Sequence, residues 1–247
     1  ITHLKLIDKT LYIVDTGNPS TVAYLKAMLK KEPGCIKDIV IMQTHFHNDH
    51  CARLPELLAF VRKNQIPTKL VFNKNLHHQF AGFFTTNLRV FKNNPSLQLQ
   101  PVEEKNSYHH AQNTKFELFN DVPDLLRHFI QSNGYFLQNG DNAMFFTGDI
   151  NPPVGNNSSE KIVVAVYDYF LNILQKTLDK KISRLDIFAD AGHFSAISEL
   201  ANGFGVILEQ VERDLKAKYK LRENIRVRLI NEHAKSPRNY VTAILPD

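Results

Sequence analysis

The sequence has only two cysteines, Cys35 and Cys51, among 247 residues. Two thiols cannot build the disulfide framework of a small secreted protein. No apolar run approaches the roughly 20 residues that a membrane-spanning helix needs. Residues 1–5 read as the beginning of a strand and not as a basic region followed by a long apolar core, so no signal peptide is visible. We therefore expect a cytoplasmic protein without a membrane partner.

The chain also lacks internal repeats, heptad arrays and linkers. Its length lies within the range of one large domain, and we expect residues 1–247 to form a single domain. The net charge of +5 and the pI near 9.1 modestly favour anionic partners such as phosphates or nucleic acid. A solvated, lysine-rich surface explains the same charge, so charge alone does not identify a partner.

What the sequence does contain is a histidine cluster, Thr44-His45-Phe46-His47-Asn48-Asp49-His50, directly after the apolar run 39–42. Histidine is scarce and is the commonest protein ligand of zinc, so a cluster at this spacing is hard to explain by packing. Because a strand alternates its side chains between two faces, His45 and His47 point the same way. Asp49 and His50 follow in the turn, and the loop can serve two neighbouring metal positions. Cys51 is more simply a small apolar filler than a reactive thiol.

The pattern along the chain is that of an α/β protein. A strand at 11–15, a helix opened by Pro19-Ser20, and a strand at 38–43 form the local signature of a layered α/β domain. Asn139-Gly140 predicts a tight hairpin turn. Further strands are predicted at 69–72, 97–100, 115–119, 135–138, 143–147, 185–189 and 225–230, and further helices at 54–63, 75–84, 162–178 and 199–220, with His109-His110 in a loop.

The predicted strand ends carry conspicuous polar groups. His45 and His47, Asp149, His193 and His233 each follow a strand, and in open α/β sheets such ends form the ligand crevice. Two metals about 3.5–4 Å apart usually share a bridging carboxylate. His45 and His47 can supply one metal and Asp49 and His50 the other. Asp149 is the natural bridge, and each metal needs one further histidine.

Several motifs resemble the metallo-β-lactamase fold superfamily. Residues 44–50 after an apolar strand resemble its H-x-H-x-D-H signature, residues 11–17 resemble the strand that precedes it, and Phe146-Thr147-Gly148-Asp149 resembles its later Gly-Asp motif. The order and spacing agree across nearly the whole chain. The resemblance implies an αββα sandwich, in which two mixed sheets lie between helix layers and the metals lie at one edge.

Within that superfamily the sequence looks closest to the phosphodiesterase branch around tRNase Z. Residues 128–135 are similar to its His-x-x-x-Ser-x-Gly-Tyr stretch, and residues 53–58 to the helix after its histidine cluster. Residues 233–240 resemble its terminal His-x-Ser-x-Arg-Tyr stretch imperfectly. The resemblance implies that His128 and His233 bind metal, with His110 as the substitute for His128.

Two departures from tRNase Z bear on the substrate. The segment between His128 and Asp149 leaves no room for the insertion that clamps the tRNA elbow or for the Pro-x-Lys stretch. Residues 190–194 stand where tRNase Z has His-Glu-Ala-Thr-Phe, in a different residue order. We therefore favour compact relatives that cleave cyclic nucleotides. His193 and His233 compete for the last ligand position, and we prefer His233 as ligand and His193 as proton donor.

These observations lead to one preferred hypothesis and two rivals. The preferred one is a dinuclear metal phosphodiesterase acting on a cyclic nucleotide or other small phosphodiester, with RNA as a further candidate substrate. Asp49 and His193 would be catalytic, and Lys235 or Arg238 would bind the phosphate. Zn²⁺ is expected, with Mn²⁺ or Fe²⁺ as alternatives, and relatives suggest a homodimer. The rivals are an acyl hydrolase, for which Phe80, Phe83 and Phe84 could line a groove, or a tRNA 3′-end endoribonuclease; a non-enzymatic binding protein would not need the complete ligand set.

Overall fold

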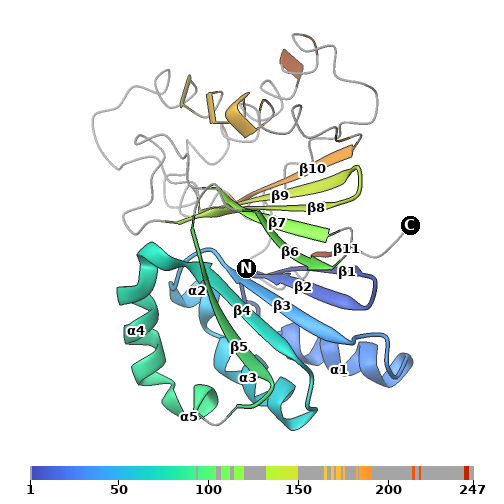
Figure 1. Cartoon of the computed structure of the whole chain (residues 1–247), viewed down its shortest axis with the longest axis vertical. Helices are drawn as coiled ribbons and strands as arrows, with labels where there is room; N and C mark the ends of the chain where they lie inside the picture. Colours follow the sequence, from blue (N-terminus) through green and yellow to red (C-terminus); the bar gives the residue numbers. More distant parts are fainter. Residues whose placement is uncertain are drawn as a thin grey trace. The chain divides into compact units, whose positions relative to one another are not determined.

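The computed structural model divides into two compact units, residues 1–103 with 238–247, and residues 104–237 (Figure 1). Each unit has a sheet of its own, and the single domain over 1–247 stays a prediction. The residues described are 2–92, 94–103, 107–111, 114–119, 132–149, 164–165, 168–169, 171–173, 175, 182, 184–190, 213–214, 217 and 242–244.

The first unit is built on a six-stranded sheet in the order β11-β1-β2-β3-β4-β5. Only the β1–β2 pair is antiparallel, so the sheet is mixed. Its strands are β1 (His3–Ile7), β2 (Thr10–Val14), β3 (Asp38–Gln43), β4 (Thr68–Asn73), β5 (Leu97–Val102) and β11 (Thr242–Ile244). Its helices are α1 (Thr21–Lys31), α2 (Asn48–Cys51), α3 (Leu54–Lys63), η1 (Lys74–Leu76), α4 (His77–Thr86) and α5 (Leu88–Phe91).

The core of this unit follows from side-chain periodicity. In α3, the buried residues Leu54, Leu57, Leu58 and Val61 recur at helical spacing and form one apolar stripe. They pack in one cluster with Val22 and Leu25 of α1 and with alternate residues of the strands, such as Ile39 and Ile41 of β3. The intervening strand residues are buried as well, including Tyr12, Val40 and Met42. Burial on both faces explains why these strands are continuous apolar runs.

The second unit contains a five-stranded sheet in the order β10-β9-β8-β7-β6. The β9–β10 pair is parallel and the other pairs are antiparallel, so this sheet is also mixed. Its strands are β6 (Ser107–Ala111), β7 (Thr114–Phe119), β8 (Gly134–Asn139), β9 (Asn142–Asp149) and β10 (Arg184–Asp190). Two mixed sheets with helices confirm the predicted α/β class.

The hairpin and two strands differ from the prediction. Asn139 pairs with Asn142, so the turn is Gly140-Asp141, one residue later than expected, and Gly140 takes the positive φ of 59°. His109 and His110 lie in β6 and not in a loop, because the edge strand β6 is specified by its backbone pairing with β7 and lacks an apolar pattern. β11 was not predicted, and the strand predicted at 225–230 lies outside the described residues.

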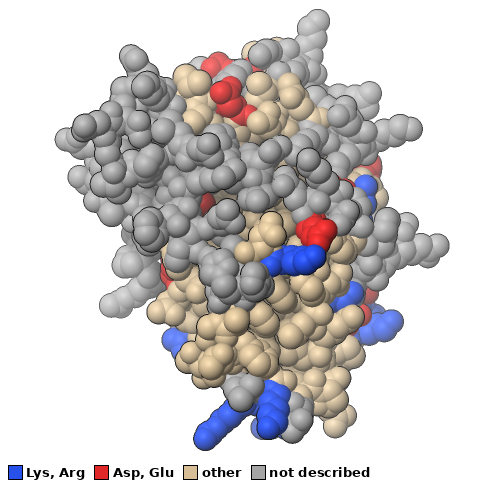
Figure 2. All heavy atoms as spheres, turned by 60° about the vertical axis from the view of Figure 1, so that its left-hand side comes forward, with Lys and Arg blue, Asp and Glu red and all other residues tan. Residues whose placement is uncertain are grey.

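Two whole-chain expectations can be compared with the structure. Among the residues described, no helix is both long enough and apolar enough to cross a membrane. On the face drawn in Figure 2, the Lys and Arg side chains lie at separate points and are interspersed with other residues.

Candidate metal site

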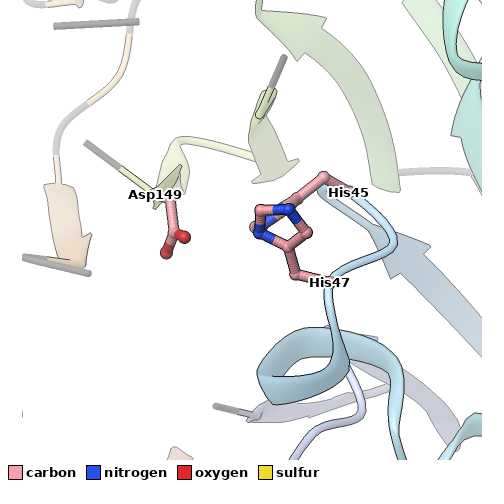
Figure 3. A group of neighbouring side chains, drawn as sticks. All are labelled: His45, His47 and Asp149. Carbon is pink, nitrogen blue, oxygen red and sulfur yellow. The ribbon is translucent and has the colours of Figure 1, made fainter. Parts of the chain in front are cut away.

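The histidine cluster lies where the first unit's sheet ends. Residues 44–47 connect β3 to α2, which begins after His47, and His47 itself is extended, with φ of −74° and ψ of 153°. His45 and His47 lie side by side, with ring centroids 4.7 Å apart (Figure 3). The short helix then turns His50 back, and its ring centroid lies 4.2 Å from that of His45.

The four predicted ligands of this loop differ in exposure. His45 and His50 are buried, His47 is half-buried, and the carboxylate of Asp49 is 50% exposed. Asp49 Oδ2 lies 3.6 Å from His50 Nε2. The loop thus brings together three imidazoles and one carboxylate, with the carboxylate on the solvent side.

A buried carboxylate that sequence reasoning missed organises this cluster. Asp15 lies just past β2, in a left-handed conformation with φ of 59°. Because β2 and β3 are adjacent and parallel, their carboxyl ends meet, and Asp15 reaches the beginning of the loop. It accepts hydrogen bonds from the Thr44 backbone N–H at 2.8 Å, Thr44 Oγ1 at 2.8 Å, Gln43 Nε2 at 2.9 Å and His50 Nδ1 at 2.7 Å. The signal that could have revealed it was its place at the end of the neighbouring parallel strand.

The environment of Asp15 keeps it ionised. Burial opposes ionisation, but the charges that His50 and His45 carry when protonated, together with the hydrogen bonds from His50 and Thr44, hold the pKa of Asp15 below its usual value. An ionised carboxylate has no proton to donate, so His50 must carry its proton on Nδ1. When His50 is neutral, as binding of a cation requires, its lone pair is therefore on Nε2, the atom near Asp49. Metal-binding histidines typically use their second nitrogen in this way, donating to a carboxylate.

The same reasoning fixes the tautomer of His45. Thr44 Oγ1 has one proton and donates it to Asp15. His45 Nδ1 lies 3.0 Å from Thr44 Oγ1, which can therefore only accept from it. His45 thus carries its proton on Nδ1 and presents the lone pair of Nε2. Asp15 thus orients His50 directly and His45 through Thr44.

The backbone around the cluster is held at several points. Gln43 Nε2 donates to the carbonyl oxygens of His45 at 2.7 Å and His50 at 3.1 Å. The backbone N–H of Thr16 donates to the same His50 carbonyl at 2.6 Å, and the N–H of Arg53 donates to the Thr16 carbonyl at 2.9 Å. These bonds tie the C-terminal end of α2 to the segment after β2, and Gln43, the last residue of β3, bonds to the backbone on both sides of the α2 start. The ligand geometry is therefore set before any ion binds, as a precise metal site requires.

Two other buried groups lie close to this network. Burial, with the charges of Asp15 and Asp49, raises the pKa of the Cys51 thiol to about 12. Cys51 is thus a neutral thiol in the core, as expected of an apolar filler. Burial lowers the pKa of His3 in β1 to about 4, although the charge of Asp15 acts in the opposite direction. His3 is therefore neutral at pH 7.

In the second unit, Asp149 is the last residue of β9 (Figure 3). It is buried, and its backbone N–H donates to Ser132 Oγ at 2.9 Å. Gly148 before it takes a φ of 63°, a conformation that favours glycine and explains the Gly-Asp pair. The strand end, the glycine and the segment before β8 together fix the backbone of Asp149.

The donor set of the loop fits a divalent cation. Imidazole nitrogens and carboxylate oxygens suit Zn²⁺, and also Mn²⁺ and Fe²⁺. Each of the five described candidates, His45, His47, Asp49, His50 and Asp149, offers one such ligand atom. Of the other predicted site residues, His128, His193, His233, Lys235 and Arg238 lie outside the described residues, and His110 lies in β6.

Comparison with known proteins gives similarities in structure only. No family model matches the sequence, and no curated protein matches it. The chain is similar to the metallo-β-lactamase fold protein YhfI from Bacillus subtilis, with 11% identity, a TM-score of 0.47, and coverage of 90% of this chain and 84% of that chain. It is similar to the short form of human tRNase Z, with 17% identity, a TM-score of 0.46, and coverage of 83% and 80%.

A third similar structure is Zn²⁺-bound PqqB from Methylobacterium extorquens, with 12% identity and a TM-score of 0.41. The match covers 72% of this chain and spans 56% of PqqB. The fold that the sequence motifs resemble is thus found among the structures to which this chain is similar.

Proposed function

We propose that the protein is a metal-dependent hydrolase that cleaves a cyclic nucleotide or another small nucleotide phosphodiester. The observation that carries the metal dependence is the Asp15 network, which holds the proton of two buried histidines on Nδ1, the arrangement typical of histidines that bind a metal through Nε2. The preference for phosphodiesters rests on the flanking motifs that resemble the tRNase Z branch.

The proposed ligand sets divide the residues between two divalent ions. His45, His47 and His128 would hold the first, and Asp49, His50 and His233 the second, with Asp149 shared. We propose Zn²⁺, with Mn²⁺ or Fe²⁺ as the alternatives that the same donors accept. Such a pair, when bound, lowers the pKa of water toward neutrality and neutralises phosphoryl oxygens.

The chain's own residues would supply the remaining steps of hydrolysis. Asp49 is 50% exposed, so its carboxylate is accessible to solvent and would accept a hydrogen bond from the attacking water and orient it. The attacking water would release a proton to solvent as its oxygen bonds to phosphorus, and as the old P–O bond breaks His193 would donate a proton to the leaving alkoxide. Lys235 and Arg238 would bind the phosphate oxygens.

The rival acyl hydrolase gains no support from the phenylalanines of α4. Phe80, Phe83 and Phe84 are half-buried and pack against the helix-side core of the first unit, which accounts for them as core residues. We therefore propose no acyl substrate on their account. The substrate class can be tested by measuring turnover of bis-p-nitrophenyl phosphate, p-nitrophenyl acetate and a lactone in the presence of Zn²⁺ or Mn²⁺.

The proposal expects phosphodiester cleavage that is lost in His47→Ala and retained in the control His109→Ala. Turnover of the ester or lactone without phosphodiester cleavage would overturn the phosphodiesterase assignment and favour the acyl hydrolase. Cleavage of a tRNA 3′ trailer in preference to 2′,3′- or 3′,5′-cyclic nucleotides would instead favour the endoribonuclease. We also propose a homodimer, which can be tested by measuring the molar mass of the purified protein in solution by light scattering.

The choice between His193 and His233 needs a separate measurement. We expect His233→Ala to bind one ion fewer than the wild type by elemental analysis of the dialysed protein. His193→Ala should keep both ions and lose turnover, since it would act on the leaving group only. If His233→Ala keeps two ions and His193→Ala does not, the two roles are exchanged.

A further inference from the structure

Phe46 separates two of the proposed ligands, His45 and His47, and its side chain lies on the other side of the loop. The two histidine rings lie side by side, with centroids 4.7 Å apart. Phe46 instead contacts Phe80 at 5.5 Å, Phe83 at 5.6 Å and Phe72 at 6.3 Å between ring centroids. One residue of the loop is thus anchored in an aromatic cluster of the first unit.

This aromatic cluster joins the loop to α4. Phe80 of α4 stacks on Phe72 of β4 with centroids 4.3 Å apart and planes inclined by 16°. Phe91 of α5 contacts Phe80 at 5.8 Å and Phe83 at 6.2 Å, both edge to face. Within the described part of the chain, α4 therefore packs through its phenylalanines, and two of these touch the metal loop.

We propose that Phe46 is a positioning residue that couples the packing of α4 to metal binding by the loop. Packing of Phe80 and Phe83 fixes the Phe46 side chain, and the backbone of Phe46 in turn sets how His45 and His47 are presented. Coupling between two equilibria is reciprocal, so a cation bound by these histidines must also stabilise the packing of α4. This inference rests on the proposed metal dependence and says nothing of the substrate.

The coupling can be measured without any activity assay. Hydrogen exchange of the α4 backbone amides, residues 77–86, is followed in the wild type with and without Zn²⁺. Zn²⁺ affinity is measured by competition with a chromophoric chelator in the wild type, Phe46→Leu and Phe84→Leu. Phe84 is the matched control, because it has the same side chain in the same cluster but contacts Phe80 and Phe91. The visible spectrum of bound Co²⁺ reports the ligand geometry in all three proteins.

The proposal expects Zn²⁺ to slow exchange in α4 of the wild type and of Phe84→Leu, and not in Phe46→Leu. It also expects Phe46→Leu to lose about tenfold in Zn²⁺ affinity, the effect usual for groups that orient metal ligands, and to change the Co²⁺ spectrum. Equal losses in the two variants would show a general packing effect and overturn it. The proposal would also be overturned if the wild type binds Zn²⁺ and the hydrogen exchange of α4 does not change. This measurement needs only the wild type, so it can be made even if Phe46→Leu does not fold. A wild type that binds no Zn²⁺ would refute the proposed metal dependence itself.

Discussion

Replacing Asp15 with asparagine should weaken metal binding by changing the tautomer of His50. Both carboxylate oxygens of Asp15 act only as acceptors, and Oδ2 accepts hydrogen bonds from Thr44 Oγ1 and His50 Nδ1. The Thr44 backbone N–H and Gln43 Nε2 both bond to Oδ1, which the amide oxygen can replace. The amide nitrogen then faces His50 Nδ1 and donates to it. His50 must therefore hold its own proton on Nε2, which removes the lone pair intended for the cation.

Asp15→Asn should reduce both the Zn²⁺ affinity and the free energy of unfolding, and the size of each loss can be given to an order of magnitude. Groups that orient metal-binding histidines contribute about 10- to 100-fold in affinity, which corresponds to about 1.4–2.7 kcal/mol. Losing a buried hydrogen bond to a charged group such as the Asp15 carboxylate costs about 1.5–3 kcal/mol of folding free energy. The side chains of Asp15 and His50 are 2% and 0% exposed, so solvent cannot compensate for the lost interaction.

Three measurements on one pair of variants test this reasoning. Zn²⁺ affinity is measured by chelator competition, the free energy of unfolding by urea titration, and the His50 tautomer by ¹⁵N NMR of the imidazole. Asp8→Asn is the matched control, since Asp8 is exposed and has a similar left-handed backbone, with φ of 47°. If Asp15→Asn keeps the wild-type affinity, or if His50 remains protonated on Nδ1, the network does not orient the ligand.

The stability difference between wild type and Asp15→Asn should also depend on pH. The pKa of Asp15 is lowered in the folded protein, so its ionised form contributes stability above the unfolded pKa of about 3.9. That contribution is lost as pH falls through the lower, folded pKa. Unfolding of the metal-free proteins between about pH 6 and pH 2 should therefore show the difference shrinking in acid.

Three further predictions concern folding stability. Burial lowers the pKa of His3 to about 4, so the folded protein resists protonation that the unfolded chain accepts. The free energy of unfolding should therefore fall by roughly 3 kcal/mol as pH falls from about 6.5 to 4. In urea titrations, His3→Gln should remove this dependence on pH. Gly134→Ala places a Cβ 2.8 Å from Phe145 Cζ and 2.9 Å from the Phe146 carbonyl, and should cost about 1–3 kcal/mol. A Cβ added at Gly82 has nothing within 4 Å, so Gly82→Ala should not lower the free energy of unfolding and should stabilise α4 slightly. Equal losses of stability in Gly134→Ala and Gly82→Ala would contradict the steric argument. In Zn²⁺ at about 100 times Kd, unfolding should require about 2.7 kcal/mol more than in chelator, and no change would contradict metal binding.

Local sequence pattern was sufficient where one period or one short motif specifies the structure. The apolar stripe of α3 and the apolar runs of β3 and β4 gave their positions to within a residue or two, because burial of one stripe or of both faces leaves a direct mark on composition. The alternation of an extended segment likewise placed His45 and His47 on one side. The Gly-Asp pair at residues 148–149 lies at the end of β9, as predicted.

The local sequence pattern did not predict elements whose position is set by backbone pairing with another strand. The strands β6 and β11 are specified by backbone bonds to β7 and β1, which impose no apolar period on their own residues. The turn moved by one residue to Gly140-Asp141, because the register of β8 with β9 fixes which residues remain unpaired.

The sequence by itself determined that the loop at residues 44–50 is rich in metal ligands, because ligand type and spacing are local properties. Only the tertiary structure decided which nitrogen each buried histidine presents. That choice depends on Asp15, 35 positions away from His50 and brought to it by the parallel pairing of β2 and β3. A proton on one ring nitrogen is fixed by the hydrogen bond it makes, and no spacing within the loop records that partner.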